Sequence, residues 1–180
     1  MSTLKTFNPK SNELIAELEV TTDEQINEML KQAKEAQKAW GAKTVQERAD
    51  IVVKAYDDII AEKQILADLI HQEMGKTPKE ALGEVEAYAS RIQNMADEVV
   101  AALQPTTTND SKVLTTTYYD PLGVCASITP WNFPMGMPHT LMMPSLMAGN
   151  TVIFKPSEEV PLIGLKYAEI LNKILPPNIL

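Results

Sequence analysis

Residues 121–159 read PLGVCASITPWNFPMGMPHTLMMPSLMAGNTVIFKPSEE, and the alternation of strands and helices expected here indicates the fold class. GVCASI at 123–128 and TVIFK at 151–155 are short, mostly apolar runs, as expected for buried strands. A Met-rich segment long enough for a helix connects them, and a further helix is expected from about residue 159. This β-α-β-α alternation predicts an α/β fold with a parallel sheet and right-handed crossovers.

The carboxyl ends of these two strands are the expected ligand side of the sheet, because open parallel sheets bind ligands there. The first strand continues into TPWNFP at 129–134, where two prolines restrict the backbone around a carboxamide. A fixed Asn132 amide can donate a hydrogen bond to an oxygen that gains negative charge in acyl chemistry, as in an oxyanion hole. The alternative is that Asn132 only caps a turn, since Asn beside Pro is common in turns.

The second strand ends in KPSE at 155–158, which combines a cation, a hydroxyl and a carboxylate. The Glu158 carboxylate can accept ribose hydroxyls and repels a 2′-phosphate, while Lys155 and Ser157 can donate to ribose or phosphate oxygens. An ordinary helix start with Ser157 as N-cap explains the same residues, and both interpretations can hold together. The loop after the first strand lacks G-x-G-x-x-G, so this pattern alone does not indicate a dinucleotide.

Upstream of this unit the sequence is helical. LIAELEV at 14–20, with Asn8-Pro9 before it, predicts a short β-hairpin or edge strand. Three apolar stripes at helical spacing follow, and each begins at a threonine that can cap a helix. The stripes predict a helix over 22–41, one or two helices over 44–75, and a helix over 77–103, packed as three antiparallel helices.

Polar and extended residues separate the helical part from the α/β unit. PTTTNDS at 105–111 is a polar run, and KVLTTTYYD at 112–120 is rich in β-branched and aromatic residues, so it is expected to be extended. Three consecutive threonines give this segment no strongly apolar face. It therefore suits an edge strand, an arm, or a surface that another subunit covers.

Composition limits the classes of function. The 180 residues hold 16 basic and 24 acidic side chains, a net charge of −8, which disfavours nucleic acid and anionic membranes as partners. No apolar run reaches the length of a membrane span and no signal core opens the chain, so the cytoplasm is the expected location. One cysteine and two histidines support neither a disulfide nor a metal site. Cys125 lies inside the first strand and is expected to be buried and inert.

Two further groups of residues are expected to have structural rather than functional roles. The acidic cluster around 73–86 could form paired carboxylates, but a solvated helix face is the favoured explanation. Its members are Glu73, Glu80, Glu84 and Glu86. The Met-rich segment is expected to pack in the core, with a contact to a substrate channel as the alternative. Its members are Met135, Met137, His139, Met142, Met143 and Met147.

Together, PLGVCASITPWNFP, MPSLMAGNTVIFKPSE and the earlier EMGKTPKEALGEVE resemble the N-terminal portion of an NAD(P)-dependent aldehyde dehydrogenase. The resemblance runs from about residue 7 to the end of the sequence. It implies a helical part of the cofactor-binding domain at 1–104, an oligomerisation arm at 105–120, and the first half of a Rossmann-like dinucleotide-binding unit at 121–180. It also implies a homo-oligomer that forms through the arm.

The resemblance also implies roles for individual residues. Asn132 matches the oxyanion-hole amide of the family. The cofactor cleft is expected to be lined by Ile128, Thr129, Pro130 and Trp131. The adenosine ribose is expected to contact Lys155, Ser157 and Glu158. The implied cofactor is NAD, with NADP possible in the family, and the implied substrate is a small aldehyde.

The resemblance implies that some catalytic parts lie beyond Leu180. These are the glycine-containing cofactor motif, the general-base glutamate and the cysteine nucleophile. The expectation is an aldehyde dehydrogenase that is active as the longer chain, whereas residues 1–180 alone are inactive because Cys125 cannot replace the nucleophile. The alternative is a non-catalytic, truncated paralogue that acts as an oligomerisation or interaction module.

Overall fold

A computed structural model describes residues 2–180 of the chain. The two predicted strands of the α/β unit are β5 (Val124–Ile128) and β6 (Thr151–Lys155), which pair in parallel. The crossover helix α6 (Gly136–Met147) joins them, and α7 (Pro161–Leu171) follows. Beyond α7, the Val152 N–H donates to the Ile179 carbonyl at 2.9 Å, so the chain returns along the free edge of β6. The predicted β-α-β-α order and parallel pairing are confirmed.

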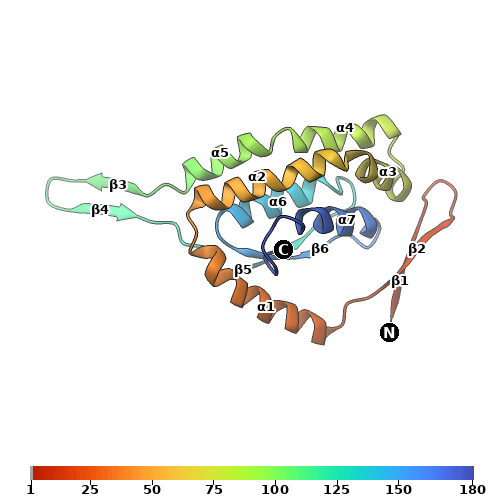
Figure 1. Ribbon diagram of the computed structural model, residues 1–180, viewed down its shortest axis with the longest axis horizontal. Helices are drawn as coiled ribbons and strands as arrows, with labels where there is room; N and C mark the ends of the chain where they lie inside the picture. Colours follow the sequence, from red (N-terminus) through yellow and green to blue (C-terminus); the bar gives the residue numbers. More distant parts are fainter. Residues whose placement is uncertain (1) are drawn as a thin grey trace.

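Helices cover both faces of this small sheet (Figure 1). Helix α1 (Asp23–Gly41) packs on one face, and α6 and α7 lie on the other. The remaining helices form an outer layer that packs against α6 and α7. They are α2 (Val45–Ala61), α3 (Lys63–Met74), α4 (Pro78–Ala89) and α5 (Ile92–Ala102). The sheet is therefore the middle of an α/β/α arrangement with an added helical layer.

The predicted helix starts are confirmed at atomic detail. Thr22, Thr44 and Thr77 each accept the N–H of the residue three positions on, and the side chain of that residue returns to the threonine N–H. Each reciprocal pair satisfies two backbone donors that the first turn of a helix leaves open. These local signals locate the starts of α1, α2 and α4.

The outer layer contains more helices than predicted, because residues 77–103 form two helices and not one. The segment 44–75 forms two helices, α2 and α3, which was one of the two alternatives. The prediction of a single helix over 77–103 was wrong, because the chain breaks between α4 and α5 at Ser90 and Arg91. There the Ser90 hydroxyl donates to the Ala87 carbonyl at 3.1 Å, so a side chain competes for backbone acceptors. The apolar stripe continues across the break, which is why periodicity did not reveal it.

Two hairpins extend from the helical body at opposite ends (Figure 1). The predicted N-terminal hairpin is confirmed as β1 (Thr3–Phe7) paired antiparallel with β2 (Leu14–Glu19). The second hairpin pairs β3 (Thr106–Asn109) with β4 (Leu114–Thr117), and every residue of both strands is exposed. The polar run at 105–111 thus contains a strand that its composition did not predict.

The Met-rich helix α6 is a core element, as predicted. Met135, Met142, Met143 and Met147 are fully buried. Its carboxyl end is held by α1 and α2. There the Trp40 indole N–H donates to the Leu146 carbonyl at 2.9 Å, and the Arg48 Nε donates to the Met147 carbonyl at 2.8 Å. The Arg48 donor satisfies a carbonyl in the last turn of the helix, and the Leu146 carbonyl accepts the Gly149 N–H at 3.0 Å in addition to the indole.

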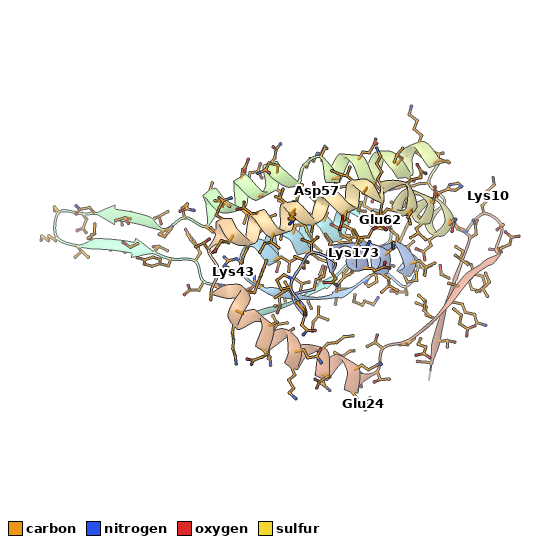
Figure 2. All side chains as sticks on the ribbon, in the orientation of Figure 1. Lys10, Glu24, Lys43, Asp57, Glu62 and Lys173 are labelled. Atoms are coloured by element: carbon orange, nitrogen blue, oxygen red, sulfur yellow. The ribbon has the colours of Figure 1, made fainter. Side chains whose placement is uncertain are left out.

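Charged side chains join α7 to the turn between α2 and α3. Glu62, at that turn, pairs with Lys173 just beyond α7 and with Lys166 within it, the latter at 3.3 Å. Glu62 and Lys173 come from segments far apart in the sequence and lie together in Figure 2. Hydrogen bonds from Lys173 lower the pKa of the Glu62 carboxyl, so it is ionised at neutral pH. Within residues 2–180, no helix is long and apolar enough to cross a membrane.

His139 lies inside α6 at the centre of the core and is buried. Its Nδ1 hydrogen-bonds to the Tyr56 hydroxyl, which also hydrogen-bonds to the Tyr167 hydroxyl, so one residue from each of α2, α6 and α7 meets here. Burial, with a smaller contribution from the positive charge of Arg91, lowers the pKa of His139 to about 4. The imidazole is therefore neutral at physiological pH.

We predict that the buried His139 imidazole makes the protein less stable in acid. An imidazole with a folded-state pKa near 4 and an unfolded-state pKa near 6.5 opposes protonation only while the chain is folded. We therefore expect the free energy of unfolding to decrease by roughly 3 kcal/mol as the pH falls from 6.5 to 4. Denaturant unfolding of the wild type and of a His139→Gln variant across this range tests it. A variant with the same slope as the wild type would contradict the prediction.

Candidate functional site

The two predicted site loops leave the sheet at the same edge. The parallel register pairs Ile128 with Lys155, so β5 and β6 end side by side. The pairing continues one residue further, where the Thr129 N–H donates to the Lys155 carbonyl at 3.2 Å. Residues 129–135 and 156–160 therefore form one surface at the carboxyl ends of the strands, as the topology predicted.

The first loop exposes the groups that can contact a ligand. Asn132 is exposed, and within residues 2–180 its carboxamide makes no hydrogen bond, so the turn-capping alternative is not supported. Trp131 and Ile128 are also exposed, at 52% and 68%. Thr129, in contrast, is buried and fixes the start of the loop. The loop thus presents a free carboxamide next to an indole.

The second loop carries the three predicted polar residues. Lys155 donates to Glu158 at 2.5 Å, and this hydrogen bond is the main cause of the lowered pKa of the Glu158 carboxyl. Ser157 is buried and accepts the Glu159 N–H at 3.3 Å. The prediction of Ser157 as a helix N-cap was wrong, because α7 begins only at Pro161. Glu158 is thus a solvent-facing carboxylate that stays ionised at neutral pH.

A pocket of about 570 Å³ lies beside these two loops. Trp131, Ser157 and Glu158 line one side, and the N-terminal strand β1 lines the other with Lys5 and Phe7. This volume falls within the range of about 300–1,000 Å³ that small-molecule sites occupy. The pocket brings together an aromatic ring, a hydroxyl and a carboxylate, which suits a ligand with a flat ring and several hydroxyls.

Two glutamates occupy the helix N-termini that border the loops. Glu84 on α4 accepts the N–H groups of Met135 and Gly136 at 3.1 and 3.2 Å, where α6 begins. Glu73 on α3 accepts those of Leu162 and Ile163 at 2.9 and 2.8 Å, where α7 begins. Helix N-termini are common anion sites, and here protein carboxylates fill both of them. Phosphate groups are therefore not expected at these two positions.

The interpretation of the acidic cluster as a solvated face was wrong for Glu73 and Glu84. Both are buried, because each finds backbone donors on a crossover helix. Burial raises the pKa of Glu73, although its hydrogen bonds oppose the shift. Glu80, in the capping box of α4, and Glu86, paired with Lys63 at 2.6 Å, are both exposed and follow the prediction. The spacing of acidic residues in the sequence did not reveal that Glu73 and Glu84 are buried.

Cys125 lies near the amino end of β5 and is half-buried rather than buried as predicted. It lies three positions before the last residue of the strand, a distance of roughly 10 Å at the usual rise of a strand. The thiol is therefore remote from the loop that carries Asn132. It does not form part of the candidate site.

The sheet, its crossover helices and the polar groups at its carboxyl edge define the first part of a dinucleotide-type α/β domain. The chain belongs to the aldehyde dehydrogenase family, whose model matches residues 1–180.

Individual relatives agree with this assignment. The chain is 38% identical to the mitochondrial succinate-semialdehyde dehydrogenase of Arabidopsis thaliana and 32% identical to malonate-semialdehyde dehydrogenase 1 of Geobacillus kaustophilus. Each match covers 99% of this chain but only 34% and 37% of the relative. The chain thus spans about a third of the length of these curated relatives.

Solved structures show the same fold. An aldehyde dehydrogenase from Brucella melitensis biovar abortus 2308 matches with a TM-score of 0.92 and 34% identity, over 99% of this chain and 37% of that one. An NADP-dependent glyceraldehyde-3-phosphate dehydrogenase from Bacillus halodurans C-125, solved with NADP, matches with a TM-score of 0.91 and 30% identity. That match covers 99% of this chain and 39% of the other. These matches confirm the predicted fold class.

Proposed function

We propose that the protein oxidises an aldehyde to a carboxylic acid with NAD or NADP, and that residues 1–180 supply the oxyanion-stabilising amide and part of the cofactor site. The free Asn132 carboxamide carries the proposal, because it directly follows Trp131, which lines the pocket beside the two loops. Family membership supports it, as do relatives named as semialdehyde dehydrogenases.

The chemistry assigned to Asn132 is stabilisation of charge. When a nucleophile adds to an aldehyde carbonyl, the oxygen becomes negative, and a fixed amide N–H can donate to it. The carboxamide has no internal hydrogen bond within residues 2–180, so no partner has to be displaced first.

The residues of the second loop fit the ribose of a nucleotide. Glu158 is ionised and can accept two adjacent hydroxyls, while Lys155 and Ser157 can donate to oxygens. When bound, the nicotinamide cofactor supplies the hydride acceptor of the oxidation. Because the Glu158 carboxylate repels a 2′-phosphate, we propose that NAD binds better than NADP. Some relatives are named as NADP enzymes, so Lys155 could offset part of this repulsion.

Steady-state kinetics of the full-length protein test the proposed function. Short semialdehydes, such as those in the names of the relatives, are the first substrates to try with NAD and with NADP. Formation of reduced nicotinamide, with a lower KM for NAD than for NADP, is the expected result. The absence of turnover with a broad set of aldehydes would contradict the proposal.

We propose further that residues 1–180 alone do not turn over aldehydes. Cys125 is the sole cysteine in this sequence, and it lies within β5 away from Asn132. A separately produced 1–180 segment therefore lacks a suitable thiolate. Turnover by this segment that survives Cys125→Ser would contradict this explanation of inactivity. The cytoplasm remains the location proposed for the protein.

A second role, in assembly, is favoured by the β3–β4 hairpin. Both strands are fully exposed, and Val113, Leu114 and Tyr118 present apolar surface at or next to the hairpin. A two-stranded hairpin without a core is marginal alone, so a covering surface would stabilise it. We propose that it pairs with a second copy of the protein to form a homo-oligomer. This role also suits the alternative of a non-catalytic interaction module.

Replacing Leu114, which is 68% exposed, with Asp is expected to weaken the oligomer. A charge buried in an apolar contact is costly, so the measured mass should shift toward that of the monomer. Light scattering after size-exclusion chromatography measures this. Ile65→Asp is the matched control, because Ile65 is 48% exposed on α3 at the other end of the molecule. A monomeric wild type, or equal effects of both variants, would contradict the role of the hairpin.

A further inference from the structure

Lys76 contacts the loop of Asn132 from the helical layer. Its ammonium group donates to the main-chain carbonyl of Asn132 at 3.2 Å and lies 4.2 Å from the centre of the Phe133 ring. It also forms an ion pair with Glu84, in which the two side chains are 16% and 2% exposed. One cation from a remote part of the sequence thus touches two consecutive loop residues.

Glu84 extends these contacts to the end of the same loop. One carboxylate oxygen pairs with Lys76, and the other accepts the N–H groups of Met135 and Gly136. Gly136 also fits closely here, because a Cβ atom at this position would lie 2.4 Å from the Tyr88 ring. The loop is therefore held at its middle by Lys76 and at its end by Glu84.

The backbone around Lys76 is itself fixed. Gly75 ends α3 in the left-handed region at φ 82°, and Thr77 begins α4 with a capping box. Between them, the Lys76 carbonyl accepts a hydrogen bond from His71 Nδ1 at 2.6 Å. The ammonium group therefore projects from a rigid turn between two helices, not from a mobile surface segment.

We infer that Lys76 and Glu84 are positioning residues for the Asn132 carboxamide: together they hold the backbone of residues 132–136, from which the carboxamide projects. The inference rests on the proposed role of Asn132. The carboxamide has no internal partner within residues 2–180, so the place from which it projects is set by the backbone that carries it. A buried ion pair with additional hydrogen bonds resists displacement better than an exposed one. Neither side chain needs to touch the substrate.

Hydrogen–deuterium exchange in the full-length protein tests the physical contact. Lys76→Met keeps the side-chain length but removes the charge, and Glu84→Gln keeps the shape and one acceptor oxygen. Both variants should exchange the amides of Met135 and Gly136 about tenfold faster, because both amides donate to Glu84, whose carboxylate Lys76 holds. Lys63→Met is the matched control, since it breaks an exposed ion pair, Lys63–Glu86, between the same two helices. Unchanged exchange in both test variants would overturn the inference.

Kinetics then separate positioning from general stability. Lys76→Met should lower kcat roughly 10- to 100-fold with a smaller effect on KM, while Lys63→Met leaves both unchanged. Combined with Asn132→Ala, Lys76→Met should cause no further loss, because the amide that it positions is gone. Losses that multiply would overturn the inference, since Lys76 would then act independently of Asn132. If Asn132→Ala alone leaves kcat unchanged, the proposed role of Asn132 is wrong, whatever the exchange data show.

Discussion

Asn132→Ala is expected to lower kcat of the full-length protein by about 10²- to 10³-fold, with a small change in KM. The amide would act mainly on the negative oxygen that develops during the reaction, so its loss weakens transition-state binding more than substrate binding. Asn132 is exposed and its carboxamide makes no hydrogen bond within residues 2–180, so its removal should not destabilise the fold. Steady-state kinetics and a thermal melt of the same preparation measure both effects.

Two matched variants make this result specific. Asn132→Asp keeps the size but replaces the N–H donor with an acceptor, so it should lose at least as much activity as the alanine variant. Asn27→Ala removes an exposed carboxamide on α1, on the opposite face of the sheet from α6, and should leave kcat unchanged. A melting temperature that falls with activity in Asn132→Ala would indicate a structural role instead.

Glu73→Ala is expected to lower the free energy of unfolding by about 3 to 4 kcal/mol. Glu73 is buried and accepts hydrogen bonds from Leu162 N–H, Ile163 N–H and the Thr6 hydroxyl, the last at 3.2 Å. Truncation leaves these three donors without their acceptor and opens a space under the pocket. The N-terminal strand β1 should also separate from α3, because Thr6 loses its partner on that helix.

Denaturant unfolding measures this loss, and hydrogen exchange of residues 3–7 reports the release of β1. Glu86→Ala is the control, because Glu86 lies in an exposed ion pair whose contribution is typically below about 1 kcal/mol. Equal losses in the two variants would contradict the role assigned to Glu73. A large loss of stability without faster exchange in β1 would limit that role to the start of α7.

The fold could be predicted largely because its signals are local. Thr44 and Glu47 form a capping box within one helical turn, and GVCASI and TVIFK are recognisable as strands over five or six residues. The break at Ser90 was missed because the apolar stripe runs through it without interruption. The strand β3 was missed because Thr106–Asn109 has no apolar face, and it forms only by pairing with β4.

The residues of the candidate site also fall into those that the sequence predicted and those that it did not. Asn132, Lys155 and Glu158 could be proposed because they lie at or just beyond the carboxyl ends of predicted strands, where a parallel sheet binds ligands. Glu73 and Glu84 were assigned to solvent because helical periodicity does not show which acidic side chain faces a helix N-terminus. Lys76 drew no attention, since its contacts lie 8 and 56 residues away along the chain.

Local patterns in the sequence were enough to predict the α/β class, the order of β5 and β6, the starts of α1, α2 and α4, and the loop that carries the free carboxamide. Each of these follows from interactions within a few residues or from the rules of parallel sheets. Tertiary packing, in contrast, sets which charged groups are buried, how β1 closes one side of the pocket, and how Lys76 and Glu84 support the Asn132 loop. These features depend on desolvation and hydrogen-bond geometry between distant segments, and neither exists until the helical layer packs against the sheet.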